Sequence, residues 1–265
     1  MTATQNSYKK SSFGPAFLFL SKPRRKALAD YYEFCRLMDD IADEPSENPL
    51  CQLDFWQQEI TRLYNNQPQT DLGKRLQAHI NQFHIPQDRF LLLIEGMRAD
   101  LQGKKYASFE DLNWYLHRVA VVVGQATLDI LGVQSPKADQ LAWALGSAVQ
   151  LTNIIRDVSD DARLQRVYLP CDIAAKEILL EKNAPILKTL LYQTAQKAHA
   201  KYKQAFALMN EFPRLKMLPC RIMGYVYLKN LAKIEVGGFC VTRPVKLTKR
   251  EKLQAVSYGL FKTFF

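Results

Sequence analysis

Apolar side chains recur at helical spacing along most of the chain, and short polar or proline-containing breaks separate the helical stretches. Phe90, Leu91, Ile94 and Met97, for example, fall on one face of a helix. This pattern predicts an all-α fold, and the length of 265 residues favours a single domain spanning residues 1–265. The helices that we expect cover residues 24–44, 50–65, 71–83, 86–101, 109–131, 135–164, 172–181, 185–211, 218–236 and 248–265.

Capping residues mark several of these helix ends. Ser135-Pro136 is a start signal, and Gly237-Gly238 is a stop signal. Asp172 and Thr248 are the expected N-caps of the helices that follow them.

The first expected helix carries a polar stripe beside its apolar face. Tyr32, Arg36, Asp39 and Asp43 are spaced by 4, 3 and 4 residues. At about 100° per residue, these four side chains fall within an arc of about 60°. The carboxylates of Asp39 and Asp43 therefore lie one turn apart and point the same way.

The helix over residues 135–164 carries a second polar stripe. Gln150, Asn153, Asp157 and Asp161 are spaced by 3, 4 and 4 residues and cover an arc of about 80°. The rest of this helix is apolar nearly all round, which is typical of a helix inside a protein. A buried stripe of amides and carboxylates is costly unless a partner compensates it.

A divalent cation would compensate both stripes. Carboxylates one turn apart repel each other, and two such pairs that face each other repel further. Mg²⁺ takes oxygen ligands, keeps waters and is often shared between carboxylates and a substrate phosphate. Two acidic pairs on facing helices therefore suggest a site that holds a diphosphate through Mg²⁺. Arg36, Arg156 and Arg166 are nearby cations that suit phosphate oxygens.

Each acidic pair also has a plainer interpretation. Asp39 and Asp43 precede Pro45 and are compatible with a solvated helix end, and Asp157 and Asp161 are compatible with surface ion pairs. The matched spacing of two pairs, each within an apolar helix, favours a shared site.

Composition narrows the possible partners. Lys and Arg total 36 and Asp and Glu total 26, so the formal net charge is +10. This balance suits nucleic acid, an anionic membrane surface or a phosphorylated substrate. No recognisable nucleic-acid-binding motif accompanies the charge, so we expect no nucleic-acid partner.

The cysteines and the apolar runs bear on location. Five cysteines without a C-x-x-C motif are typical of a reduced, intracellular chain. No run approaches 18 uninterrupted apolar residues, which excludes a transmembrane helix. We therefore expect a cytoplasmic protein.

The residues around the two stripes resemble the squalene/phytoene synthase family of head-to-head prenyl transferases. The first motif, residues 32–44, reads YEFCRLMDDIADE; the second, residues 150–163, reads QLTNIIRDVSDDAR. Two such motifs in this order, about 118 residues apart, make the resemblance specific. It extends over about residues 10–245 and is most similar to bacterial enzymes of hopanoid pathways. Supporting strings are SSF at 11–13, GMRADL at 96–101, RVA at 118–120 and RVYLP at 166–170.

The resemblance implies an isoprenoid-synthase helical bundle around a central cavity, in which the acidic motifs bind Mg²⁺ and two prenyl diphosphates. Carried over by motif, the metal ligands are Asp39, Asp43, Asn153, Asp157 and Asp161, and the same four aspartates with Tyr32 are the catalytic residues. The diphosphate-binding residues are Ser12, Arg36, Gln150, Asn153, Arg156, Arg166, Tyr168 and Tyr227, with Arg243 as a further candidate.

The roles of Asp100, His117 and several aromatic residues stay open. Asp100 is either an additional acid in the cavity or a charge on a helix surface. His117 stands where the family usually has a tyrosine; it either contacts a phosphate or is a core histidine. The aromatic residues that could line a cavity for a cationic intermediate, or simply pack in the core, are Phe13, Phe17, Phe19, Tyr32 and Phe239.

The implied reaction is the Mg²⁺-dependent head-to-head condensation of two farnesyl diphosphates to presqualene diphosphate and pyrophosphate. The alternatives are a phytoene synthase that uses geranylgeranyl diphosphate, a squalene or dehydrosqualene synthase, and a catalytically silent assembly factor of the same fold. NADPH is expected only if a reductive second step follows. The oligomeric state stays open.

The last expected helix carries both apolar and basic side chains. Leu253, Val256, Leu260, Phe261 and Phe264 lie on one side, and three basic residues lie near its start. The helix either packs on the body of the protein or makes peripheral contact with the inner membrane surface. The basic residues are Lys249, Arg250 and Lys252.

Overall fold

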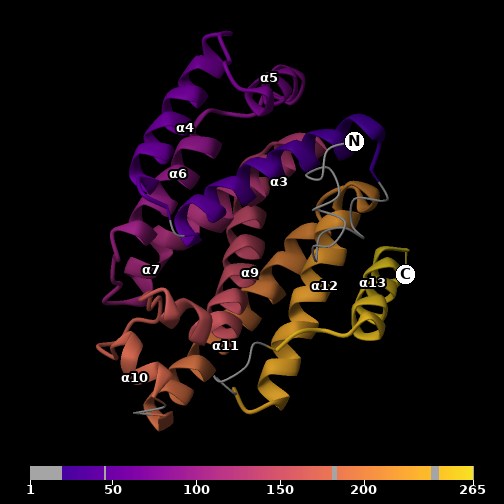
Figure 1. Ribbon diagram of the computed structural model, residues 1–265. Helices are drawn as coiled ribbons and strands as arrows, with labels where there is room; N and C mark the ends of the chain where they lie inside the picture. Colours follow the sequence, from indigo (N-terminus) through magenta and orange to yellow (C-terminus); the bar gives the residue numbers. More distant parts are fainter. Residues whose placement is uncertain (1–19, 45, 181–183, 240–244, 265) are drawn as a thin grey trace.

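The computed structural model describes residues 20–44, 46–180, 184–239 and 245–264, and these residues form helices without any β-strand (Figure 1). The all-α prediction is confirmed, while the single-domain organisation stays a prediction. The helices are α3 (Lys22–Asp43), α4 (Pro49–Tyr64), α5 (Asp71–Phe83), α6 (Asp88–Leu101), α7 (Phe109–Leu116), η2 (His117–Val121), α8 (Val122–Leu131), α9 (Pro136–Arg163), α10 (Ala175–Leu179), α11 (Ala184–Met209), α12 (Arg214–Val236) and α13 (Lys249–Phe264).

Helix α9 is the central element, and it contacts α7, η2, α8, α10, α11 and α12 (Figure 1). The Ser135 side chain caps it by accepting a hydrogen bond from the Ala138 N–H at 3.2 Å, and Pro136 occupies the first turn, where its missing N–H does no harm. Sixteen of its 28 residues are buried on several faces. This burial explains why the helix is apolar nearly all round.

The described residues form two hydrophobic cores. One is built mainly by α3, α4, α5, α6 and α8, and the other mainly by α7, α9, α11 and α12. Figure 1 shows α3 crossing between the α4–α6 group and the group formed by α9, α11 and α12. The two stripe-bearing helices, α3 and α9, thus belong to different cores.

The helix predicted over residues 109–131 is interrupted. It divides into α7, the π-helical segment η2 and α8, because one turn accommodates an extra residue. The bulge packs closely on its neighbours: a Cβ atom at Gly146 would lie 2.9 Å from the Ala120 carbonyl oxygen, and one at Gly96 would lie 2.6 Å from Val119 Cγ1. Glycine at both positions allows this approach.

Two helix starts were predicted wrongly. Helix α10 begins at Ala175 with Ala174 as its N-cap, not Asp172, and the Ala174 N–H donates to Glu177 Oε2 at 3.0 Å. Helix α12 begins at Arg214 rather than at residue 218, and Pro219 lies inside it.

The cap at Thr248 is confirmed. The Glu251 N–H donates to Thr248 Oγ1 at 3.2 Å, and the Thr248 N–H donates to Glu251 Oε2 at 2.7 Å. This reciprocal pair is a capping box that fixes the start of α13. None of the helices in the described part of the chain has the length and hydrophobicity needed to cross a membrane.

Candidate active site

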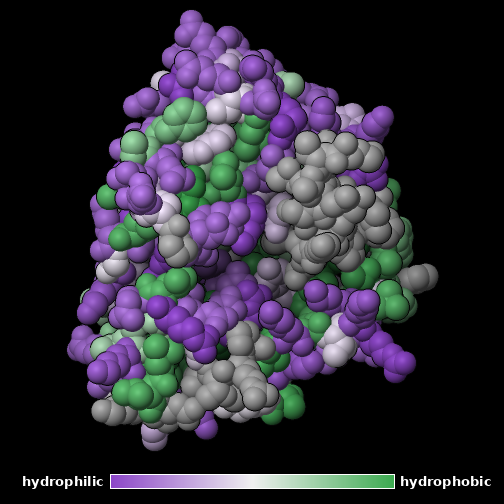
Figure 2. Space-filling view, viewed as in Figure 1, coloured by the Kyte–Doolittle hydropathy of each residue, from purple (hydrophilic) through white to green (hydrophobic). Residues whose placement is uncertain are grey.

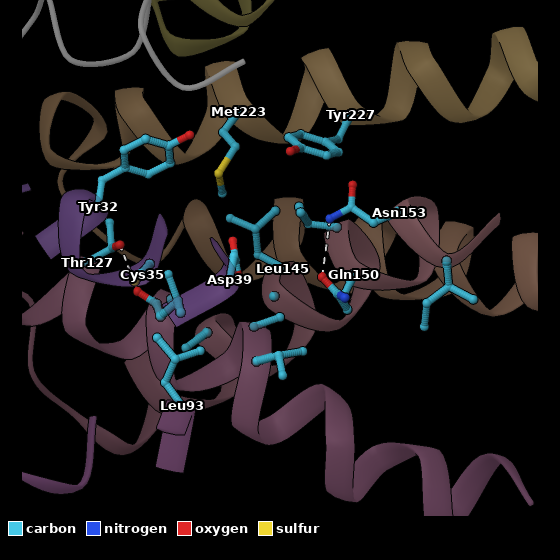
Figure 3. Close-up of a pocket in the computed structure, with 18 of the residues that line it drawn as sticks. Tyr32, Cys35, Asp39, Leu93, Thr127, Leu145, Gln150, Asn153, Met223 and Tyr227 are labelled. Atoms are coloured by element: carbon cyan, nitrogen blue, oxygen red, sulfur yellow. Dashed lines mark hydrogen bonds between the residues drawn. The ribbon is translucent and has the colours of Figure 1, made fainter. Parts of the chain in front are cut away.

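A cavity of about 550 Å³ lies between the two cores, with walls from α3, α6, η2, α8, α9 and α12 (Figure 3). Its lining changes along the two stripe-bearing helices. The first halves of α3 and α9 contribute apolar residues such as Leu28 and Leu141, and the last halves contribute the acids. In Figure 2, hydrophilic residues gather around a hollow near the centre of the view. The cavity therefore has a polar end and an apolar end.

The structure brings the described candidate residues together in this cavity. Ser12 and Arg243 lie outside the described residues, as do Phe13, Phe17 and Phe19. The candidates that line the cavity are Tyr32, Arg36, Asp39, Asp43, Asp100, Gln150, Asn153, Arg156, Asp157, Asp161, Arg166, Tyr168 and Tyr227.

On α3, the two acids differ in their surroundings. Asp39 is half-buried and points into the cavity (Figure 3), and burial, followed by repulsion from Asp43, raises the pKa of its carboxyl to about 7. Among the described residues, none donates a hydrogen bond to Asp39. Arg36 pairs with Asp40 at 2.6 Å, at the edge of the cavity.

On α9, the side chains of the polar stripe form hydrogen bonds with nearby side chains. Arg156 Nε donates to Asp157 Oδ1 at 2.7 Å, and Arg156 is also hydrogen-bonded to Tyr227 of α12. Asn153 Nδ2 donates to Gln150 Oε1 at 3.2 Å, as the dashed line in Figure 3 shows. This contact leaves Asn153 Oδ1 buried without a hydrogen-bond partner among the described residues.

The acids of the two motifs interact across the cavity. Burial and then repulsion from Asp157 and Asp100 raise the pKa of Asp161 well above its usual value, and the Asp43 carboxylate adds to this shift. Asp43 belongs to α3 and Asp161 to α9, so the two polar stripes face one shared volume.

Arg166 connects the two motifs directly. Its guanidinium pairs with Asp43 and donates to the Ala42 carbonyl oxygen at 2.7 Å. The segment that follows α9 is thereby fastened to the last turn of α3. The pairing also places a positive charge beside the acids at the polar end.

Asp100 is buried and lines the cavity, so it is not an exposed charge on a helix surface. Its carboxylate accepts hydrogen bonds from the Tyr115 hydroxyl at 2.9 Å and from the Tyr168 hydroxyl at 3.0 Å, and the two rings stack with centroids 4.7 Å apart. Burial still raises the pKa of Asp100 to about 6. The predicted contact of Tyr168 with a diphosphate stays a prediction, since its hydroxyl is bonded to Asp100 here.

Sequence reasoning missed Tyr115 and Met223, which also line the cavity (Figure 3 labels Met223). Tyr115 lies three residues before the Arg118-Val119-Ala120 string, and this proximity to a family string was the one available signal. Met223 lies on α12 without any motif.

Two of the positions that the sequence left open have an outcome. His117 does not line the cavity; its ring packs against Trp143 with centroids 5.7 Å apart, and burial, then Arg118 and Arg89, lower its pKa. His117 therefore packs outside the cavity in this structure. Phe239 was left open between the cavity wall and the core, and the structure packs it on the core that includes α9.

The donor set at the polar end fits Mg²⁺ that is completed by a ligand. Among the described residues, no three His, Cys, Asp or Glu side chains are grouped closely enough to hold an ion by themselves. Mg²⁺ usually binds through one or two carboxylates, waters and substrate phosphates rather than in an all-protein cage. The two acidic pairs and the unpartnered, buried Asn153 Oδ1 supply oxygen donors of this kind.

The fold and the cavity define an isoprenoid-synthase helical bundle. The chain aligns with the crystal structure of squalene synthase HpnC from Alicyclobacillus acidocaldarius with a TM-score of 0.81 and 25% identity, covering 89% of this chain and 91% of that one. A family model described as Squalene/phytoene synthase matches residues 8–251. The chain belongs to the squalene/phytoene synthase family, as its motifs suggested.

Two bacterial relatives match over nearly their whole length. The presqualene diphosphate synthase of Rhodopseudomonas palustris is 34% identical over 253 residues, which cover 92% of this chain and 90% of the relative. The presqualene diphosphate synthase of Zymomonas mobilis is 32% identical over 260 residues, which cover 95% of this chain and 88% of the relative.

Proposed function

We propose that this chain catalyses the Mg²⁺-dependent head-to-head condensation of two farnesyl diphosphates to presqualene diphosphate and pyrophosphate, a step toward squalene and hopanoids. The observation that carries the proposal is the convergence of Asp39, Asp43, Asp157 and Asp161 on the polar end of one cavity whose remaining walls are apolar. The similarity to presqualene diphosphate synthases supports this choice of reaction.

The polar end suits two diphosphates with Mg²⁺. When bound, Mg²⁺ would neutralise charge on a diphosphate and favour its departure. The residues that we propose to hold it are Asp39, Asp43, Asn153, Asp157 and Asp161.

The arginine pairs suggest how this chain receives a diphosphate. Arg156 and Arg166 each neutralise one motif acid, Asp157 and Asp43. A diphosphate offers the same kind of oxygen acceptors as a carboxylate, and a guanidinium can bind two of them at once. We infer that binding transfers these donors from the aspartates to phosphate oxygens, so that the aspartates become free to act as metal ligands. Further diphosphate contacts are proposed for Ser12, Arg36, Gln150, Tyr168 and Tyr227.

The apolar end suits the hydrocarbon chains and protects a cation. The C1–O bond of one substrate breaks, which releases pyrophosphate and leaves an allylic carbocation. The double bond of the second chain attacks C1, and loss of one proton closes a cyclopropane ring. Leu93, Val123, Leu145 and Met223 line the walls and keep water from the cation. The Tyr32 ring presents a face that tolerates positive charge.

The test is product analysis with purified protein. With farnesyl diphosphate and Mg²⁺, we expect pyrophosphate release and a C30 cyclopropyl diphosphate by mass spectrometry. A larger product from geranylgeranyl diphosphate alone would instead assign a phytoene synthase, and a squalene or dehydrosqualene product, with or without NADPH, would extend the reaction. No pyrophosphate release from folded protein with either donor would assign a silent assembly factor.

We also propose a cytoplasmic location with peripheral membrane contact. Cys35, Cys51, Cys171 and Cys220 are free, which suits a reducing compartment. The proposed substrates and product are lipids, so a position at the membrane surface would bring them close to the cavity.

A further inference from the structure

Helix α13 exposes several of its large apolar side chains and buries its small ones, while Val256 and Leu260 pack partly buried against the core that includes α3. Ala255, Gly259 and Thr263 are its buried residues, and a Cβ atom at Gly259 would lie 3.2 Å from Ile222 Cα of α12. Leu253 is 67% exposed, and Phe261 and Phe264 are each 53% exposed. A helix that packs on a globular protein normally buries its large apolar residues. On α13, three large apolar residues face solvent instead.

Three exposed apolar residues lie on one side of α13, in an arc that also contains Arg250 and Ser257. At about 100° per residue, Leu253, Phe261 and Phe264 fall within an arc of about 80°. We call these three residues the α13 face. Leu215 of α12 is also exposed, at 68%, and the neighbouring Arg214 donates to the Phe264 carbonyl oxygen at 3.4 Å. Figure 1 shows α13 at the outer edge of the molecule, beside α12, which provides its main contacts in the described part of the chain.

Basic residues accompany the α13 face: Arg250 falls within its arc and Lys249 next to it, whereas Lys252 and Lys262 lie about 100° outside the arc. Helix α13 has four cations and one acid, Glu251, and this acid already pairs with Lys233 at 2.7 Å. The Lys262 ammonium lies 5.9 Å from the centroid of the Tyr258 ring and 6.0 Å from that of Phe261. The four cations are Lys249, Arg250, Lys252 and Lys262.

We propose that the α13 face docks on an anionic lipid bilayer, with α13 lying in the plane of the interface. A bilayer offers an apolar layer beneath negative headgroups, which matches exposed Leu and Phe side chains flanked by Lys and Arg. A second copy of the chain matches less well, because a symmetric dimer through this face would bring the same cations against each other. With 16 residues and four cations, the helix lies on the membrane and does not cross it.

The test compares binding to vesicles of two compositions. We expect the full chain to float with phosphatidylglycerol–phosphatidylcholine vesicles far more than with phosphatidylcholine vesicles. The triple variant Leu253→Ser, Phe261→Ser and Phe264→Ser loses about tenfold or more of this partitioning. A matched control, Leu180→Ser with Ile186→Ser, removes apolar side chains of similar exposure at another surface and leaves binding unchanged.

Other outcomes would overturn the proposal. Equal partitioning of the triple variant and the full chain would reject the α13 face as the contact, and absent binding of the full chain at low salt would reject the membrane. A concentration-dependent dimer in analytical ultracentrifugation that the triple variant abolishes would assign the face to a second copy. Circular dichroism checks that the variants fold. We expect the triple variant to release pyrophosphate from detergent-dispersed farnesyl diphosphate at the same rate as the full chain. A loss of membrane binding can then be distinguished from a loss of the proposed reaction.

Discussion

The two acidic motifs space their aspartates alike, but the arginine that pairs with an aspartate comes from a different part of the chain in each. On α3, Asp43 is the last helical residue, 45% of its side chain is exposed, and its cationic partner Arg166 lies 123 residues further along the chain. On α9, Asp157 lies within a 28-residue helix, and its partner Arg156 is the adjacent residue. The α9 half of the site is thus assembled largely within one helix, whereas the α3 half needs the segment after α9 to reach it.

This difference predicts unequal effects when one acid is removed from each half. Because the Asp157 side chain is 27% exposed and that of Asp43 45%, solvent screens Asp157 less, so Asp157→Ala should lower the rate of pyrophosphate release about a thousandfold and Asp43→Ala about a hundredfold. Steady-state kinetics with farnesyl diphosphate and Mg²⁺ measure both.

The matched control is Asp54→Asn on α4, an exposed acid that pairs with Arg98 away from the cavity. It should keep the full rate. Equal losses in the two alanine variants would show that the halves of the site contribute alike, and a full rate in Asp157→Ala would remove that acid from the catalytic set.

The second prediction concerns the connection between the halves. Arg166→Gln removes the ion pair with Asp43 and weakens the contact with the Ala42 carbonyl. We expect KM for farnesyl diphosphate to rise about tenfold, because a bidentate guanidinium contact is lost. Hydrogen exchange should also become faster in the last turn of α3, whereas Arg156→Gln should leave exchange there unchanged.

Arg163→Gln serves as the control, since Arg163 is an exposed arginine near Arg166 that pairs with Asp160. If Arg166→Gln leaves both KM and exchange unaltered, Arg166 does not hold the α3 half in place.

The third prediction uses the raised pKa of Asp39. The carboxyl titrates at about 7 in the folded protein and at about 4 in an unfolded chain. The folded state therefore binds more protons between these values, so the stability of the metal-free protein falls as the pH rises from about 4 to about 7. Asp39→Asn removes the cost of ionising this carboxyl in the folded protein and should raise the free energy of unfolding at pH 8 by about 2 kcal/mol. This value is smaller than the full pKa difference implies, because solvent screens the half-buried residue.

Urea unfolding in a chelator at pH 8 and at pH 4 measures this effect, which should be absent at pH 4. The same proton must leave when a cation binds, so Mg²⁺ affinity should increase as the pH rises through 7. Identical stability of Asp39→Asn and the parent protein at pH 8 would contradict the assigned environment.

The parts of the site that could be predicted from the sequence are those that lie within one helix. The stripes on α3 and α9 follow from spacings of three and four residues, because helical geometry alone decides which side chains share a face. The link between Arg166 and Asp43 spans 123 residues and that between Tyr168 and Asp100 spans 68, so no local pattern encodes either contact. Helix α10 begins at Ala175 instead of Asp172. The residues that form its cap are not distinctive as capping residues in the sequence, so the start could not be predicted from them.

The bulge at η2 was unpredictable for a related reason. One extra residue in a turn leaves the surrounding apolar periodicity almost unchanged. Its signature is the tight packing against Gly96 and Gly146, and these glycines come from α6 and α9. The contact is apparent only once the three helices are assembled.

The smallest effect is expected at Asp100, which lies between the two halves and belongs to neither stripe. Tyr115→Phe removes one of the two hydroxyl donors to its carboxylate without changing the ring stack with Tyr168. Losing such a buried hydrogen bond should cost about 1 kcal/mol and lower Tm by about 2 °C. Since the donor favours the charged carboxylate, the pKa of Asp100 should rise above about 6.

Calorimetry measures the stability change, and the pH dependence of Tm reports the pKa. The matched control is Tyr192→Phe on α11, whose hydroxyl is on an exposed side chain, and it should leave Tm unchanged. If Tyr115→Phe alters neither Tm nor its pH dependence, the Tyr115 hydroxyl does not support Asp100. Tyr168 would then be the one hydroxyl donor among the described residues that supports the Asp100 carboxylate.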